Sequence, residues 1–155
     1  MKIESPKDYF EYVIFYNFEK YKLKSGFLPA AFNLSNSLLN MFDWMWHTYE
    51  CRLGDDIFQK KDYRKYVYHT CPSFNYISDL ANASKHLSLN RASTKMTSIS
   101  DATAAESKFG EGGFGVGKFG RGSVIINNGG ESIDFERVAI EVYEFWRAEL
   151  NRVGE

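Results

Sequence analysis

Hydrophobic side chains recur at helical spacing over most of the first 88 residues. Near the N-terminus, Ser5 can cap a helix, Pro6 suits its first position, and Gly26 is a natural stop. The apolar face of this helix comprises Phe10, Val13, Ile14, Phe18 and Tyr21. A second helix is expected over residues 30–53, with a stripe of Leu38, Phe42, Met45, Trp46, Tyr49 and Leu53. Such spacing places one face of each helix in a core.

Two further helices are predicted before residue 88. One begins at Asp55 or Asp56, where acidic residues precede basic ones as the helix dipole favours, and Pro72 breaks it. The next runs from there to about His86. Its packing face comprises Ile77, Leu80, Ser84 and Leu87. The helical part of the chain therefore covers residues 5–88.

The composition changes to Ser, Thr, Ala and Gly over residues 92–130. Apolar and polar residues alternate over residues 87–89, which favours a short strand. Residues 123–127 and 131–135 flank Asn128-Gly129-Gly130, which predicts a β-hairpin because Asn-Gly and Gly-Gly supply the positive φ of a tight turn.

A last helix follows the hairpin, with Asp134 as its cap, and runs to about residue 151. Its predicted buried face comprises Phe135, Val138, Ala139, Val142, Phe145, Trp146 and Leu150. The fold class is therefore mainly α with a small antiparallel β-hairpin or sheet (α+β), a four- to five-helix bundle. The 155 residues are expected to form a single domain.

Composition limits the function classes. The aromatic share of 17% supplies a core, and a net charge of -1 provides no global basic field for nucleic acid. Residues 1–10 lack the apolar stretch of a signal peptide, and no apolar run approaches membrane-helix length. Cys51 and Cys71 match no metal or redox spacing. We expect a cytoplasmic protein with no membrane association and no cofactor.

The glycine-rich loop falls within residues 92–122 and reads GEGGFGVGKFGRG over 110–122. It matches G-x-G-x-x-G at Gly115, Gly117 and Gly120, but no helix follows it to present amides to a phosphate. A mobile connection between strands is the preferred interpretation. The Phe-Gly pairs beside Lys118 and Arg121 leave a nucleic-acid-binding tract as the alternative.

Two polar lines run along the predicted helices. Asp43 and His47 are four residues apart, so the carboxylate can orient the imidazole for general-base or ligand duty. A structural pair at the edge of the core is the alternative. The second line contains Asp79, Asn82, Lys85 and His86, with His86 as the expected centre of a site. If the two helices are neighbours, Asp43, His47, Asp79 and His86 could hold a metal.

Residues 60–69 read KKDYRKYVYH, a mixture of basic residues and tyrosines that can meet phosphates and bases, or form a solvated helix face. Within it Arg64 and His69 form an R-x4-H string, and Asn82 and His86 form an N-x3-H string. These strings resemble parts of the motif of HEPN domains, which are helical bundles that often dimerise. The resemblance implies RNA cleavage by Arg64 with His69 or His86. Ala81 stands where the second string would need Arg.

Three functions remain open from the sequence. The first is a non-enzymatic interaction module that binds a protein partner or forms a homodimer, in a phage-defence or counter-defence setting. The second is a HEPN-like ribonuclease, with RNA as its partner. The third is a metal-dependent hydrolase built on helix-borne Asp and His. The absence of an intact catalytic motif favours the interaction module.

Overall fold

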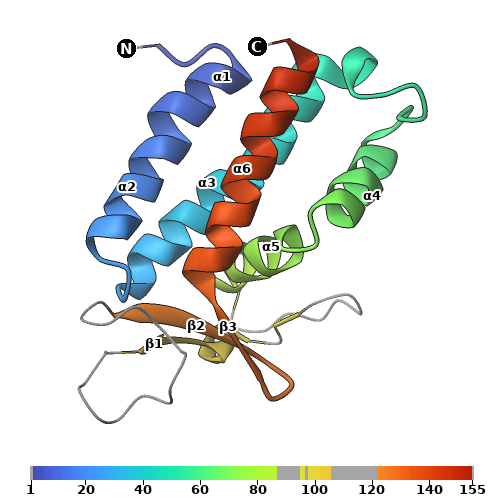
Figure 1. Cartoon of the computed structure of the whole chain (residues 1–155). Helices are drawn as coiled ribbons and strands as arrows, with labels where there is room; N and C mark the ends of the chain where they lie inside the picture. The colour runs from blue at the N-terminus through green and yellow to red at the C-terminus, as the bar shows by residue number, and fades with distance from the viewer. Residues whose placement is uncertain (1, 87–94, 97, 106–121, 155) are drawn as a thin grey trace.

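The computed structural model describes residues 2–86, 95–96, 98–105 and 122–154. In these residues the protein is mainly helical with one small antiparallel sheet, as the sequence predicts. The sheet lies at one end of the helical bundle (Figure 1). The start of α1 (Pro6–Asp8) and the end of α6 (Phe135–Val153) lie at the opposite end.

The first helix has the predicted start. Ser5 Oγ accepts the N–H of Asp8 at 3.0 Å, and the Asp8 carboxylate accepts the N–H of Ser5 at 3.1 Å. This capping box satisfies amides that the helix itself leaves unpaired. Helix α1 continues through a π-helical segment, η1 (Tyr9–Ile14), into α2 (Phe15–Leu23). Phe10, Ile14 and Tyr21 are buried as predicted, while Val13 and Phe18 are half-buried.

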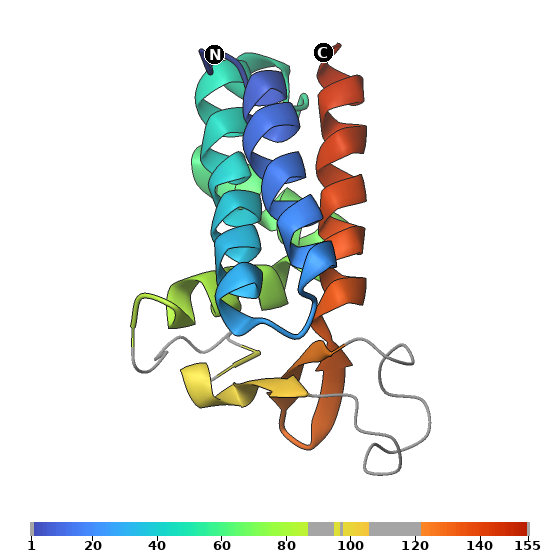
Figure 2. The same ribbon diagram turned by 90° about the vertical axis from the view of Figure 1, so that its left-hand side faces the viewer.

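The second helix, α3 (Leu28–Tyr49), runs beside α2 (Figure 2). The whole predicted stripe from Leu38 to Leu53 is buried. The helix ends earlier than predicted, because the chain tightens into a 3-10 turn, η2 (Glu50–Arg52), before Leu53 enters the core.

Helix α4 (Lys60–Thr70) begins later than the predicted Asp55 or Asp56. The Asp62 carboxylate accepts the N–H of Gln59 at 3.2 Å, and this contact fixes the N-terminal start of the helix at Gln59. Helix α5 (Phe74–Ala83) follows the break at Pro72 and ends before His86.

The sheet has the order β1-β2-β3, formed by β1 (Ala102–Ala105), β2 (Ser123–Asn128) and β3 (Glu131–Asp134). The hairpin of β2 and β3 is the predicted one, and its turn has φ of 56° at Gly129 and 98° at Gly130. Strand β1 lies in the segment expected to be a loop. It consists of small residues without hydrophobic alternation, so pairing with β2 defines it.

Helix α6 covers the bundle along its length. Its cap is Asp134, whose Oδ1 accepts the N–H of Glu136 at 3.0 Å. Trp146 is fully buried and donates its indole N–H to the carbonyl of Leu38 at 2.9 Å, which joins α6 to α3. Phe145 was predicted to be buried but is half-buried. It precedes Trp146 in the helix, so its side chain points about 100° away from the direction of the Trp146 side chain.

A close backbone approach connects the helices to the sheet. Ser25 donates its hydroxyl to the carbonyl of Gly122 at 2.5 Å, and a Cβ on Gly26 would lie 2.8 Å from Gly122 Cα. The strand predicted at residues 87–89 and the glycine-rich segment up to residue 121 lie outside the described residues. None of the described helices combines the length and the apolar character that crossing a bilayer demands.

Candidate functional site

A polar pocket of about 250 Å³ lies between α3, α4 and α5. Its lining consists of Leu39, Asn40, Phe42, Asp43, Arg64, Tyr68, Phe74, Ser78, Asn82 and Lys85. Four of these residues, Asp43, Arg64, Asn82 and Lys85, were singled out from the sequence. The fold therefore brings together side chains that the sequence placed on three separate helices.

Charges at one side of the polar pocket are arranged around Phe42. The Asp43 carboxylate forms an ion pair with Lys60 Nζ at 2.6 Å, and this ammonium lies 5.9 Å from the centre of the Phe42 ring. The Arg64 guanidinium lies over the same ring, with Cζ 5.7 Å from the centre. Because Lys60 neutralises Asp43, the cationic groups of Arg64 and Lys85 dominate the pocket.

Hydroxyl and amide groups form the other side. Tyr68 donates its phenol to Ser78 Oγ at 2.9 Å, and Asn82 Nδ2 donates to the Ser78 carbonyl at 2.6 Å. Asn82 Nδ2 also lies 3.4 Å from Ser78 Oγ. Ser78 is buried, so its hydroxyl is held in a fixed position at the base of the pocket.

None of the three histidines of the chain lines the polar pocket. His47 and His69 are exposed, as is His86, which lies beyond the end of α5. Two side chains five positions apart on a helix point in directions that differ by about 140°. Arg64 can therefore face the pocket while His69 faces solvent. The contacts of the described residues do not pair Asp43 with His47; Asp43 binds Lys60 instead.

Asp79 was predicted from its spacing to belong to a polar site with Asn82 and His86, but its contacts are structural. It is 5% exposed, and its carboxylate accepts the backbone N–H groups of Lys95 and Met96, the latter at 3.2 Å. The proposed metal set of Asp43, His47, Asp79 and His86 does not converge. Across the described part of the chain, no three His, Cys, Asp or Glu side chains lie where they could share a metal ion.

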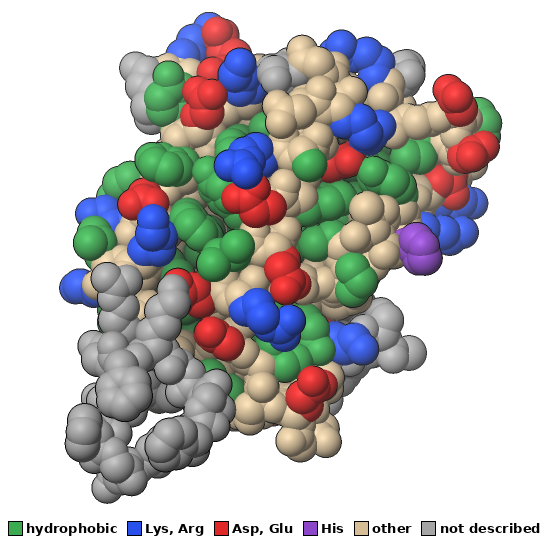
Figure 3. Space-filling model, viewed as in Figure 1, with side chains coloured by type: hydrophobic (Ala, Val, Ile, Leu, Met, Phe, Trp, Pro, Cys, Tyr) green, Lys and Arg blue, Asp and Glu red, His purple; other side chains and the backbone are tan. Residues whose placement is uncertain are grey.

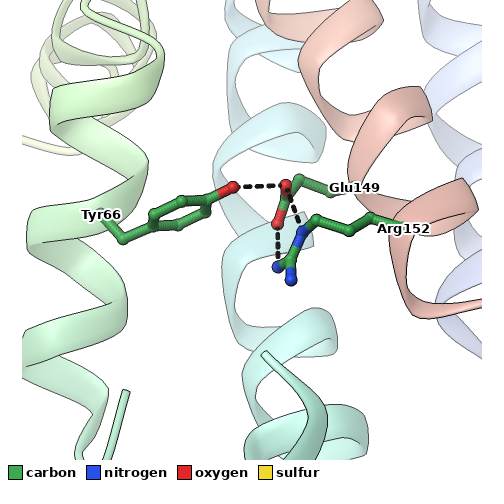
Figure 4. Close-up of polar contacts among 3 residues, drawn as sticks. All are labelled: Tyr66, Glu149 and Arg152. Atoms are coloured by element: carbon green, nitrogen blue, oxygen red, sulfur yellow. Dashed lines mark hydrogen bonds and ion pairs between the residues drawn. The ribbon is translucent and has the colours of Figure 1, made fainter. Parts of the chain in front are cut away.

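A second polar cluster, which the sequence did not reveal, connects α4 to α6 (Figure 4). Glu149 is 4% exposed, and Arg152 binds both of its oxygens, Nε to Oε1 at 2.9 Å and Nη2 to Oε2 at 2.7 Å. Tyr66 donates to Oε1 at 2.8 Å. Burial and the hydrogen bond to Glu149 raise the pKa of Tyr66. The cluster satisfies a buried carboxylate, so we assign it to stability.

An apolar groove of about 370 Å³ lies between α2 and the start of α3. Its lining consists of Tyr16, Asn17, Lys20, Leu23, Lys24, Phe27, Ala30 and Asn33. Tyr16 is 57% exposed, Leu23 77% and Phe27 52%. Hydrophobic side chains also reach the surface over α2 and along both sides of α6 (Figure 3).

Two lysines form the charged edge of the apolar groove. Lys20 Nζ lies 5.3 Å from the Tyr16 ring centre, and Lys24 Nζ lies 5.7 Å from the Phe27 ring centre. Among the residues that the structure describes, no carboxylate lines the groove. Helical spacing of hydrophobic residues predicts the buried face of a helix, so this groove, which is formed by the exposed face of α2, was not predicted. The signal was present, since Tyr16 and Leu23 are seven residues apart on the opposite side of the helix from Ile14 and Tyr21.

Comparison of this chain with protein-family models, with curated protein sequences and with solved structures finds no match.

Proposed function

We propose that the protein is a non-enzymatic interaction module whose apolar groove binds an acidic, amphipathic segment of a protein partner. The observation that carries the proposal is the exposure of Tyr16, Leu23 and Phe27 in one hollow. Large apolar side chains that share a concave surface, rather than being scattered singly, are typical of a protein-binding groove.

The lysine edge defines the chemistry of the partner. Lys20 and Lys24 place two positive charges beside the aromatic rings, and the described part of the lining has no negative charge to balance them. A segment with apolar residues facing the groove and Asp or Glu at its flanks would pair with both features. Complementary charge also accelerates association and excludes basic partners.

The ribonuclease and hydrolase alternatives have less support from the geometry. The polar pocket that contains Arg64 is not lined by His69 or His86, so an acid–base pair is not assembled there. The expected setting in phage defence or counter-defence, and a cytoplasmic location, stay predictions.

A peptide-display selection tests the proposal. A library of random peptides is selected on the wild-type protein and, in parallel, on Leu23→Glu, which places a carboxylate in the groove. We expect wild-type protein to enrich acidic peptides with apolar residues at helical spacing, and Leu23→Glu to lose them. Phe58→Ser is the matched control, because Phe58 is 80% exposed but does not line the groove.

Three outcomes would overturn the proposal. The first is enrichment of the same peptides on Leu23→Glu, and the second is no enrichment on any protein. The third is self-association of the wild-type protein, measured by analytical ultracentrifugation, that Leu23→Glu abolishes and Phe58→Ser leaves intact. That third result would assign the groove to another copy of this chain.

A further inference from the structure

We infer that the polar pocket between α3, α4 and α5 is a binding site for a small molecule that carries a phosphate group. This site is separate from the apolar groove, because the two linings share no residue. The inference rests on the arrangement of cationic and hydrogen-bonding groups around one hollow, and it does not depend on the proposed partner.

The charges favour an anion. Arg64 of α4 and Lys85, which follows the C-terminal end of α5, both line the pocket, so positive groups reach it from two separate parts of the chain. Asp43 is the one carboxylate among the described lining residues, and its ion pair with Lys60 at 2.6 Å offsets its repulsion of an anion. Arg64 is held over the Phe42 ring, which fixes the guanidinium without occupying its N–H donors.

The hydroxyl groups at the base add donors. Tyr68 and Ser78 together carry two hydroxyl protons, and the bond of 2.9 Å between them uses one. The Ser78 side chain is buried, and it accepts from both Tyr68 and Asn82. Because Tyr68 is the donor in this bond, the Ser78 hydroxyl proton remains for an acceptor in the pocket.

These donors suit a phosphate better than a planar aromatic ligand. Phe42 and Phe74 are buried, and cations already cover the outer face of Phe42, so neither ring offers a free face for stacking. A tetrahedral oxyanion can accept from Arg64, Lys85 and the Tyr68–Ser78 pair in different directions. The volume of about 250 Å³ leaves room for a small polar body attached to the phosphate.

Calorimetric titration with inorganic phosphate and with glycerol 3-phosphate tests the inference. We expect saturable binding of both, weakened about tenfold or more by Arg64→Gln or Lys85→Gln, since each removes a charge-assisted hydrogen bond. Lys65→Gln is the matched control, because Lys65 is exposed beside Arg64 but does not line the pocket, and its affinity should change by less than about twofold. Asp43→Asn should tighten binding, because it leaves the Lys60 charge unpaired at the pocket edge.

Melting temperatures of all variants separate loss of binding from loss of folding. Affinity that falls in Arg64→Gln while the melting temperature stays near that of Lys65→Gln supports the inference. Absence of saturable binding of both probes at about ten millimolar contradicts it. So do equal affinities in Arg64→Gln and Lys65→Gln, weaker binding by Asp43→Asn, or binding of an oligouridylate without binding of either small phosphate.

Discussion

Two tyrosines of α4 provide a matched test of how the cluster in Figure 4 contributes to stability. Tyr66 donates to the buried Glu149 at 2.8 Å, whereas the buried hydroxyl of Tyr63 has no hydrogen-bond partner among the described residues. Replacement of each by Phe removes one oxygen from the same helix and leaves the ring. The two variants differ in whether a hydrogen bond is lost.

The two substitutions should change the free energy of unfolding in different ways. A hydrogen bond to a charged group contributes about 1.5–3 kcal/mol to the free energy of unfolding. Tyr66→Phe should lose an amount near the lower limit, because Arg152 still binds both oxygens of Glu149. At about 2–4 °C per kcal/mol for a chain of this length, its melting temperature should fall by about 3–6 °C. Tyr63→Phe should be neutral or stabilising by up to about 1 kcal/mol, because it removes an unsatisfied buried group.

Urea unfolding followed by far-ultraviolet circular dichroism measures both differences in one experiment. Equal slopes against denaturant would show that the variants differ in stability and not in compactness. A Tyr63→Phe protein that loses as much free energy as Tyr66→Phe would refute the assignment of the cluster to stability.

Three further expectations concern the core, the loop contact and alkaline pH. Trp146→Ala should lower the free energy of unfolding by about 3–5 kcal/mol in thermal melts, and Phe145→Ala, at a half-buried position, by clearly less; equal losses would contradict the burial difference. Gly26→Ala should cost about 1–3 kcal/mol because its Cβ would meet the Gly122 backbone, and an unchanged melting temperature would contradict that contact. Burial, with nearby carboxylates, raises the pKa of Tyr21. The unfolded phenol ionises first, at about pH 10, so the stability that Tyr21 contributes is constant below that pH and is lost above it. The fall in stability above about pH 10 should therefore be less steep in Tyr21→Phe. A fall of the same slope in both proteins would contradict that cause.

Local signals in the sequence predict most of the fold. Ser5, Asp134 and the turn at Gly129 act within a few residues of themselves, so their hydrogen bonds and backbone angles can be inferred without tertiary structure. The start of α4 was missed although its signal, the capping box of Gln59 and Asp62, is also local. Strand β1 was missed for the opposite reason. Strand β1 depends on its partner β2, and nothing in the sequence of β1 encodes that partner.

The candidate site residues also divide into those that local spacing predicts and those that depend on tertiary structure. The sequence placed Asn82 and Lys85 in one polar stretch, and both line the polar pocket together with Arg64 and Asp43 from other helices. Spacing could not show that Asp79 is buried against backbone amides of residues 95 and 96, since that contact depends on how the chain returns to α5. The histidines were predicted as site residues because of their chemistry. Their exposed positions could not be predicted, because they depend on which face of each helix packs against the core.

The apolar groove is tested most directly by a charge exchange. A peptide selected on the wild-type protein is titrated into the wild type and into the double variant Lys20→Glu with Lys24→Glu, and a second peptide with lysines in place of its acidic residues is titrated into both. We predict that the acidic peptide binds the wild type at least about tenfold more tightly than the double variant, and that the basic peptide reverses this order. Equal affinity of the acidic peptide for both proteins would contradict the account.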